Sequence, residues 1–417
     1  MMVRNRVTET KAALWRRYEG LRAQKLSLDM TRGKPCEEQL KLSEPMLRYR
    51  RVRSKNGLDC RNYGALLGLP EARALCARYL GAHSSEVLIG GNSSLELMFN
   101  VLAAKMRDLS GWREQGRTPA MLCPSPGYDR HFTICERLGI KMIPVAMEKG
   151  GPCIGEVRRH LQNPDVMGVW CVPRFSNPGG EVYSDEMVHA LASLKPKCPV
   201  FMLMWDNAYA VHDLVDGAPQ LLNIFDVARE YGTLERVFAF GSFSKVTFAG
   251  AGLAMAAMSL KNLVWFTKTY EAQTIGSDKL NQLRHVRFLK NMSNIRRHMR
   301  KHRRIIAPKF AAADEVLTKE LKGKGIARWN KPQGGYFISF FLERGSAKRV
   351  VTLAAELGVR FTAAGSAFPY GEDPEDSHIR IAVTFPSIAE IRKAMEVLAV
   401  CAQIARWEQW PTERMPS

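Results

Sequence analysis

The residues with the clearest chemical potential surround a lysine at the end of an apolar run. Lys245 follows "VFAFGSFS", which supplies Ser242 and Ser244, and precedes the glycines of "FAGAG". A strand end normally meets water, so a solvated lysine is one interpretation. The other is an amine held among hydroxyls and backbone, where partial desolvation lowers its pKa and makes it a nucleophile toward carbonyls. This stretch alone leaves both interpretations open.

Five short apolar runs alternate with amphipathic stretches: "EVLIGG", "AMLCPS", "VMGVWCVP", "PVFMLMWD" and "RVFAFGSFS". Such runs are typical of a parallel sheet that is buried on both faces. Ligands bind beyond the carboxyl ends of the strands in sheets of this kind. The polar residues that follow the runs are Ser93, Ser94, Tyr128, Asn177, Asp206, Tyr209 and Lys245. Together they predict one site that suits an aromatic phosphate cofactor.

Three of these residues suit a pyridine ring. Asp206 ends "FMLMWD", where an isolated carboxylate is costly unless it is paired, and it would keep a ring nitrogen protonated so that the ring acts as an electron sink. Tyr209 and Asn177 could hold the phenolate oxygen, and Tyr128 could stack on the ring. A helix N-cap for Asp206, ordinary turn chemistry in "SNPGG" and simple packing of Tyr128 are the alternatives.

The segment "GGNSSLELMFNVL" is a candidate phosphate site. A glycine turn that opens a helix leaves free N–H groups beside the hydroxyls of Ser93 and Ser94. A plain N-cap is the competing interpretation.

The composition favours a cytoplasmic enzyme of about two subdomains. The chain has 417 residues, of which 46% are hydrophobic and 24% charged. Its nine cysteines form no CxxC pair, so neither a metal site nor a disulfide framework is expected. The stretch "FAGAGLAMAAMSL" is shorter than the ~20 residues of a membrane helix, and the first residues contain no apolar signal core. We therefore expect no membrane association.

The net charge of +20 calls for an explanation. Basic residues cluster in "LRYRRVRSK" at 47–55 and in "NIRRHMRKHRR" at 294–304. Both are interpreted as solvated helix faces, because no nucleic-acid recognition fold surrounds them, and no nucleic-acid partner is expected. The charge could instead steer dicarboxylate substrates toward the enzyme.

After about residue 295 the pattern changes to a long basic helix followed by the strand-like runs "GGYFISF", "VRFTAA" and "HIRIAVTF". The predicted fold class is therefore α/β, with a mainly parallel central sheet in a large domain and a smaller α+β domain. Residues 1–45 are predicted to form an N-terminal arm and part of the small domain, 46–296 the large domain, and 297–417 the C-terminal small domain.

The motifs "NYGALLGLPEAR", "NPGG", "DNAY", "SFSK" and "HIRIAVTF" together resemble the fold-type I pyridoxal phosphate aminotransferases. More narrowly, "LDMTRGKP", "GGNSSLELM" and "SPGYDRHF" are similar to the aspartate aminotransferases related to the effector domains of MocR-type regulators. The resemblance covers nearly the whole chain. It implies pyridoxal 5'-phosphate as cofactor and a homodimer.

The resemblance also implies roles for individual residues. Lys245 would be the Schiff-base lysine and proton shuttle, with Asp206 on the pyridine nitrogen, Asn177 and Tyr209 on the phenolate oxygen, and Tyr128 stacked on the ring. Phosphate ligands would be Asn92, Ser93, Ser94, Ser242 and Ser244, with Tyr63 reaching the phosphate in the partner subunit. Gly33 would lie over the substrate and Arg380 would bind its α-carboxylate. One position departs from the family, because Leu253 stands where a phosphate-binding arginine is common.

These roles predict transfer of the amino group of aspartate or glutamate to a 2-oxo acid such as 2-oxoglutarate, through a Lys245 aldimine. A dicarboxylate needs a second cation, and Arg130, two residues after Tyr128, is the candidate, with Arg284 and Lys34 as rivals. Alternatives are an alanine or aromatic aminotransferase or a β-lyase on the same fold. A MocR-like regulatory domain is a remote alternative, because only about thirty residues precede "TRGKP" and a winged helix needs more.

Overall fold

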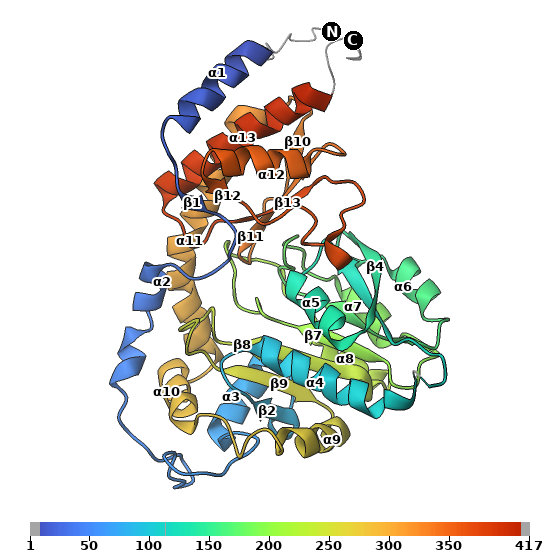
Figure 1. Ribbon diagram of the computed structural model, residues 1–417. Coiled ribbons are helices and arrows are strands. Elements are labelled where there is room, and N and C mark those ends of the chain that lie inside the picture. Colours follow the sequence, from blue (N-terminus) through green and yellow to red (C-terminus); the bar gives the residue numbers. More distant parts are fainter. Residues whose placement is uncertain (1–8, 113, 410–417) are drawn as a thin grey trace.

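The computed structural model describes residues 9–112 and 114–409, and its centre is an eight-stranded sheet (Figure 1). The spatial order is β2-β9-β8-β7-β6-β3-β4-β5. The strands are β2 (Val87–Ile89), β3 (Ala120–Ser125), β4 (Lys141–Glu148), β5 (Gly151–Pro152), β6 (Val166–Cys171), β7 (Met202–Asp206), β8 (Val237–Ser242) and β9 (Ala254–Met258).

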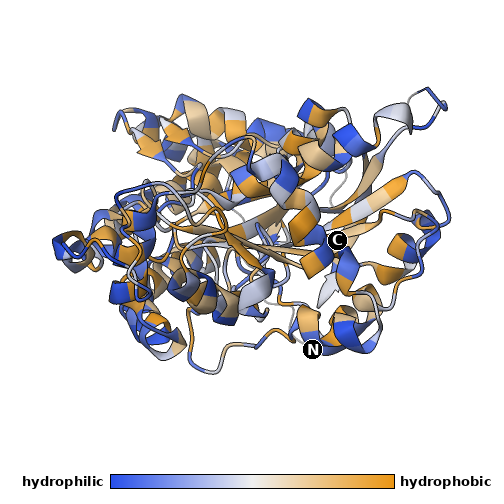
Figure 2. Cartoon of the chain, turned by 90° about the horizontal axis from the view of Figure 1, so that it is seen from below, coloured by the Kyte–Doolittle hydropathy of each residue, from blue (hydrophilic) through white to orange (hydrophobic). Residues whose placement is uncertain are grey.

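The five strands predicted from apolar runs all exist and run in one direction. Strands β8, β7, β6, β3 and β4 are parallel neighbours, whereas β9 is antiparallel to both β8 and β2, so β2 keeps the common direction. Every residue of β3, β6, β7 and β8 is buried. Figure 2 shows these apolar strands enclosed between helices that turn hydrophilic residues outward.

Helices cover both faces of the sheet, and their ends follow from local sequence. Helix α3 has Pro70 as its first residue and ends at Gly81, which is left-handed at φ 78°. The side chain of Asn291 caps α11 by accepting from the backbone N–H of Asn294. These helices are α3 (Pro70–Leu80), α4 (Ser94–Asp108), α5 (Asp129–Leu138), α6 (Ile154–His160), α7 (Asp185–Ala192), α8 (Ile224–Glu230), α9 (Leu260–Tyr270), α10 (Lys279–Leu289) and α11 (Met292–Leu321). The short helix α2 (Glu37–Lys41) packs against α11 instead, where Gln39 Nε2 lies 3.0 Å from His302 Nδ1.

A second, smaller unit lies above the sheet in Figure 1. It contains a three-stranded antiparallel sheet, β10-β11-β13, and the parallel pair β1-β12. The predicted C-terminal runs form β11, β12 and β13, and the N-terminal helix packs here, since the Tyr18 hydroxyl donates to the Leu353 carbonyl at 3.2 Å. Its elements are α1 (Lys11–Arg22), β1 (Leu28–Asp29), β10 (Ala327–Trp329), β11 (Phe337–Leu342), α12 (Ala347–Glu356), β12 (Val359–Arg360), β13 (His378–Ala382) and α13 (Ile388–Gln409).

Helix α11 joins the two units. Ile295 and Met299 belong to the core around the large sheet, whereas Ile306 and Phe310 belong to the core of the smaller unit. The predicted boundary between residues 296 and 297 falls inside this helix, and residues 1–8 and 410–417 of the predicted domains lie outside the described residues. None of the described helices has the length and apolarity that crossing a bilayer demands.

Candidate active site

A cavity of about 280 Å³ opens at the carboxyl edge of the large sheet. Parallel strands end at this edge, so side chains from distant segments meet there. The residues that line the cavity include Asn92, Ser93, Ser94, Tyr128, Asp206, Ala208, Ser242, Ser244 and Lys245. We call this space the cofactor cavity. Besides Asp206, seven residues that were predicted to bind the cofactor therefore line this cavity.

Lys245 follows the end of β8 and is half-buried. Burial lowers the pKa of its ammonium group, and the nearby carboxylate of Asp206 opposes this by raising it. Its Nζ lies 4.9 Å from the ring centroid of Tyr209. A lowered pKa increases the fraction of neutral amine, which is the nucleophilic form. The structure therefore favours an amine in a pocket over a solvated strand end.

Polar side chains also contact the backbone carbonyl groups of Lys245 and the next residue. Its carbonyl oxygen lies 3.4 Å from both His212 Nε2 and the Tyr336 hydroxyl, and the next carbonyl, that of Val246, lies 2.9 Å from His298 Nε2. Burial lowers the pKa of His212 to about 3, so its imidazole is neutral. These supporting residues were not identified from the sequence, because their contacts span segments far apart in the chain.

Asp206 is 2% exposed, and only one of its two carboxylate oxygens has a hydrogen-bond partner. Its Oδ2 lies 3.1 Å from His131 Nε2, whereas its Oδ1 is buried without a hydrogen-bond partner. A buried carboxylate oxygen without a donor is costly, so a donor is expected from a bound group. The protonated ring nitrogen of a pyridine fits this requirement. Asp206 does not act as a helix N-cap, since it is the last residue of β7.

His131 is a site residue that the sequence reasoning missed. Its ring stacks on Trp170 with centroids 4.0 Å apart and an interplanar angle of 4°. It lies edge-on to Tyr128 at 4.9 Å. The signal was available in "SPGYDRHF", where His131 stands one helical turn after Tyr128 on helix α5.

The two tyrosines differ in their surroundings but share one electrostatic property. Tyr128 lines the cofactor cavity, and Tyr209 is buried next to Tyr336 at a centroid distance of 5.9 Å. Burial is the main cause that raises the pKa of both hydroxyls. Both therefore stay protonated and can donate a hydrogen bond at neutral pH.

Arg380 reaches the same region from strand β13 of the smaller unit. Its Nη1 donates to Asp129 Oδ1 at 2.9 Å and to Asn177 Oδ1 at 3.4 Å. Its guanidinium lies over the Phe337 ring at 5.0 Å, and its Nε is buried without a partner. Gly33 packs on that ring so closely that a Cβ would lie 2.5 Å from Phe337. Arg380 is therefore hydrogen-bonded directly to Asn177 and shares the Phe337 ring with Gly33.

Hydroxyl groups gather at the start of helix α4. Ser244 Oγ donates to the Asn92 carbonyl at 2.6 Å, and Ser242 Oγ donates to Ser244 Oγ at 2.7 Å. Ser93 occupies the N-cap position, but its side chain makes no capping hydrogen bond. Its hydroxyl and the first N–H groups of α4 are thus available to an anion. The geometry favours the phosphate interpretation over the plain N-cap.

The positions of the positively charged residues agree less well with the sequence prediction than the positions of the hydroxyl groups do. Leu253 is buried in the large core, and among the described residues that line the cofactor cavity Lys245 is the only cation. Arg130 is exposed on the first turn of α5 and does not line the cavity. Of its rivals, Lys34 is exposed and stacks on Phe385 at 3.8 Å, and Arg284 is half-buried on α10.

Tyr63 also lies outside the cavity of its own chain. It is 77% exposed, in the loop that precedes α3. A large aromatic side chain that is almost fully exposed is available for contact with another molecule.

Comparison with known proteins agrees with this geometry. Residues 2–413 match the family model described as aspartate amino-transferase. A Mycolicibacterium smegmatis protein named as an aminotransferase is 43% identical over 404 residues, which is 94% of each chain. An aspartate aminotransferase of Corynebacterium glutamicum is 39% identical over 403 residues, covering 95% of this chain and 93% of that protein.

Solved structures agree as well. The crystal structure of an aspartate transaminase from Corynebacterium glutamicum superposes with a TM-score of 0.90 at 38% identity, covering 96% of each chain. An α-aminoadipate aminotransferase from Thermus thermophilus, complexed with N-(5'-phosphopyridoxyl)-L-leucine, has the same fold, with a TM-score of 0.74 at 21% identity and 96% of each chain covered. The chain therefore belongs to the aminotransferase family of fold-type I, whose cofactor is pyridoxal phosphate.

Proposed function

We propose that this aminotransferase moves the amino group of aspartate or glutamate to a 2-oxo acid such as 2-oxoglutarate. The observation that carries the proposal is the cofactor cavity itself, where Lys245 lies near a buried carboxylate, Asp206, that has one unpartnered oxygen. The choice of a dicarboxylate donor is supported by the name of the Corynebacterium glutamicum relative. We also infer membership in the subgroup related to MocR-type effector domains from the motifs of the sequence.

Bound pyridoxal phosphate supplies an electron sink for the negative charge that develops on the substrate Cα. Lys245 Nζ would take the proton from the substrate Cα and deliver it to the carbon of the cofactor that carries the amino nitrogen. Its lowered pKa suits this role, because the neutral amine is the base. The contacts of His212 and Tyr336 with the Lys245 carbonyl hold the backbone from which the amine reaches.

Asp206 would accept the ring N–H through Oδ1, while His131 holds Oδ2. The protonated hydroxyl of Tyr209 and the amide of Asn177 would donate to the phenolate oxygen. Tyr128 would cover one face of the ring and exclude water from it. Each of these groups is buried or lines the cavity, which strengthens its electrostatic effect.

The phosphate would be held by Asn92, Ser93, Ser94, Ser242 and Ser244, together with the N-terminus of α4. These donors are neutral, since Leu253 replaces the arginine that is common in the family. We also propose that Tyr63 completes this site in the partner subunit of a homodimer, which its high exposure permits.

Arg380 would bind the substrate α-carboxylate, because its buried Nε lacks a partner and its guanidinium is positioned by Asp129 and Phe337. Gly33 would lie over the substrate. Arg130 is the next residue after Asp129, which positions Arg380. The backbone of Arg130 therefore lies next to the proposed α-carboxylate site, which supports Arg130 as the ligand of the distal carboxylate. We also propose that the domains divide after residues 45 and 296, as the sequence predicts, and that the protein is cytoplasmic.

The most direct test of donor specificity compares aspartate with alanine. In the wild type, kcat/KM should favour aspartate, and Arg130→Ala should lower the ratio by about one to two decades because alanine has no distal carboxylate to lose. An unchanged ratio would move the role to Arg284 or Lys34. A wild type that prefers alanine or an aromatic amino acid, or that eliminates a β-substituent instead, would reject the aspartate proposal.

The dimer proposal has a separate test. Mixing inactive Tyr63→Phe and Lys245→Ala variants should restore part of the activity, because some sites of a hybrid dimer combine an intact Tyr63 with an intact Lys245. A monomer with full activity in analytical ultracentrifugation would exclude this arrangement.

A further inference from the structure

A second cavity lies behind the end of strand β7. Its volume is about 500 Å³, and Trp205 and Asn207 line it, whereas Asp206 and Ala208 line the cofactor cavity. Successive side chains of a strand point to opposite faces, so the two cavities lie on opposite sides of this strand end. We call the second space the basic cavity.

The lining of the basic cavity is rich in arginine. The arginines are Arg78, Arg174, Arg296, Arg300 and Arg303, and two aspartates, Asp213 and Asp216, oppose them. The cavity therefore has an excess of three positive charges. Three of the arginines come from "NIRRHMRKHRR", so one face of this basic segment does not simply project into water.

Two residues that line the basic cavity carry polar atoms without partners. The Tyr79 hydroxyl and Asn207 Oδ1 are buried and make no hydrogen bond, and the two residues are 5% and 8% exposed. Arg174, also 5% exposed, donates to Asp213 Oδ1 at 2.8 Å and to the Pro219 carbonyl at 3.0 Å. One buried donor and one buried acceptor are thus left for a ligand.

The exposed part of the lining contains charges that are not neutralised. Arg296 and Arg300 stand one helical turn apart on α11, and Arg78 lies on α3. All three are exposed, and Arg78 and Arg296 form no ion pair or hydrogen bond within the described residues. The pKa of Asp216 is lowered by its hydrogen bond with Arg303 and also by the charge of Arg300. Arg303 differs, since its Nη1 binds Asp216 at 2.6 Å. Burial lowers the pKa of Arg174, and the positive charge of Arg296 contributes to this, so the two guanidinium groups repel each other.

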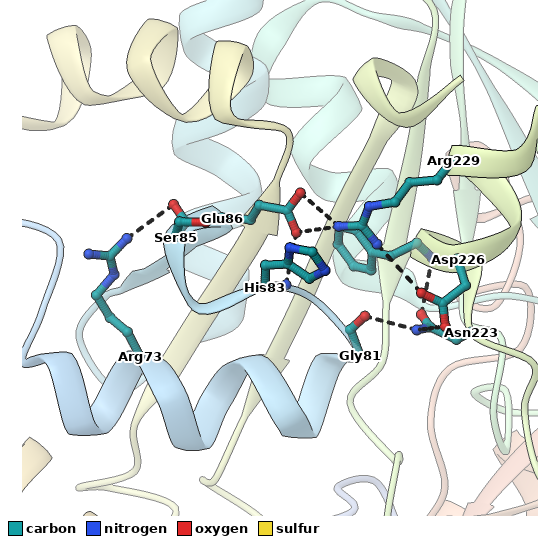
Figure 3. Close-up of polar contacts among 9 residues, drawn as sticks. Arg73, Gly81, His83, Ser85, Glu86, Asn223, Asp226 and Arg229 are labelled. Carbon is teal, nitrogen blue, oxygen red and sulfur yellow. Dashed lines mark hydrogen bonds and ion pairs between the residues drawn. The ribbon is translucent and has the colours of Figure 1, made fainter. Parts of the chain in front are cut away.

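The rim between α3 and α8 is tied in place (Figure 3). Asn223 Nδ2 donates to the Gly81 carbonyl at 2.9 Å and to Asp226 Oδ2 at 2.6 Å, and both Asn223 and Gly81 line the cavity. Arg229 binds both oxygens of Glu86 at 2.7 and 2.8 Å, which fixes α8 to the segment after α3. The cavity is therefore pre-formed on this side.

We propose that the basic cavity is a second ligand site, which binds a small molecule carrying two phosphoryl groups. A phosphoryl monoester carries about 1.5–2 negative charges at neutral pH, so two of them match the excess of three positive charges. The planar forks of Arg296 and Arg300 suit bidentate contacts with phosphoryl oxygens. The volume lies within the usual range of small-molecule sites and is too small for a nucleic-acid duplex. This site is independent of the proposed amino donor.

The test titrates pyrophosphate into the cofactor-saturated protein by calorimetry at constant ionic strength. Saturation with pyridoxal phosphate occupies the other phosphate site. The wild type should show one saturable site per chain and bind pyrophosphate more tightly than inorganic phosphate. In the double variant Arg296→Gln/Arg300→Gln the affinity should fall about 100-fold, or about 10-fold for each lost arginine contact.

The matched control is Arg297→Gln/Arg304→Gln. It removes the same charge from the same helix, but both residues are exposed and neither lines the cavity. Its affinity should stay within about two-fold of the wild type, since neither side chain lines the cavity and solvent-exposed charges are screened by salt. Tyr79→Phe removes only the buried hydroxyl and should weaken binding without removing any charge.

Three outcomes would overturn the proposal. Equal losses in the two double variants would mean that pyrophosphate responds only to the overall charge of +20. No saturable binding by the wild type would mean that the cavity is covered by the partner subunit or binds another class of molecule. Tight binding of a short oligonucleotide without pyrophosphate binding would assign the arginines to nucleic acid.

Discussion

The two cavities on either side of the end of β7 differ in the number of positively charged side chains that line them. The cofactor cavity is lined by four serines, one aromatic ring (Tyr128) and one carboxylate, and among the described residues that line it Lys245 is the only cation. The basic cavity is lined by five arginines and two aspartates. Only a single strand end, with Asp206 on one side and Asn207 on the other, separates them.

The difference shows that positive charge in this protein is not concentrated where the cofactor phosphate is expected. Hydroxyls and the N-terminus of α4 stand at that place, and Leu253 is buried where an arginine is common in the family. Burial is the main influence on the pKa of Lys245 and lowers it, and the charge that opposes this effect is the carboxylate of Asp206. In the cofactor cavity the chemistry of the amine should therefore matter more than its charge, whereas in the basic cavity charge should matter most.

The largest effect is expected from replacing the amine while keeping the charge. Lys245→Arg should reduce kcat about 1000-fold or more, as severely as Lys245→Ala, because a guanidinium can neither bond to the cofactor nor move the proton. Steady-state kinetics of both variants test this. Substantial activity in Lys245→Arg but not in Lys245→Ala would mean that charge alone is needed, as in the basic cavity.

The next effect concerns the carboxylate on the cofactor side of the strand. Asp206→Asn should reduce the rate of proton removal about 100-fold or more, because the ring nitrogen loses its ionic partner. His131→Asn should cause a smaller loss, since Asp206 remains but its Oδ2 is no longer held. Single-turnover measurements with excess enzyme report this step, and near-native rates in Asp206→Asn would reject the pairing.

A smaller effect is expected at the arginine that enters the cofactor side from the smaller unit. Arg380→Lys keeps the charge but removes the planar fork, and kcat/KM for the amino acid should fall about 10- to 100-fold. The absorbance spectrum of the bound cofactor should not change, because Arg380 would contact only the substrate. Equal losses in cofactor affinity and in kcat/KM would assign Arg380 a structural role instead.

The smallest effect concerns the layer beneath Lys245, which is polar yet neutral. Burial lowers the pKa of His302 to about 3, and its Nε2 lies 3.1 Å from His298 Nε2. Below about pH 6.5 His302 is therefore protonated in the unfolded chain but still neutral in the folded chain. The free energy of unfolding should fall as the pH drops below that value, by up to ~1.4 kcal/mol per pH unit for each such histidine.

Denaturant unfolding of the cofactor-loaded protein between pH 7 and 5 measures this slope. His302→Gln keeps a polar group next to Gln39, which lies 3.0 Å from His302 Nδ1, and should show a shallower slope than the wild type. Identical slopes in both proteins would show that His302 is protonated in the folded state.

The sheet could be predicted because its signal is local. Each of the five apolar runs contains its own strand, and the polar residue after it needs only the rule that parallel strands end together. Strand β9 was missed, since "AMAAM" lacks the β-branched side chains that mark a strand. Strand β4 was also missed, and its mixture of buried and exposed residues differs from the uniformly buried strands that the five apolar runs marked.

Features that depend on tertiary distances could not be predicted. The position of His131 near Tyr128 could be inferred locally, but its bond to Asp206 joins residues 75 positions apart, and no local pattern identifies that partner. The basic segment at 294–304 was interpreted as a solvated face, and Arg297 and Arg304 fit that description, whereas Arg296 and Arg300 line a cavity formed with α3. Sequence spacing shows that these residues share a helix, but not what packs against each side of it.

The central claim is that Lys245 is the residue that carries the cofactor. The direct measurement is hydride reduction of the cofactor-loaded protein, which makes a bond between lysine and cofactor permanent, followed by peptide mapping with mass spectrometry. The account predicts one modified peptide per chain, containing Lys245, and no modified peptide in Lys245→Ala. Modification of another lysine, or a modified peptide that persists in Lys245→Ala, would contradict it.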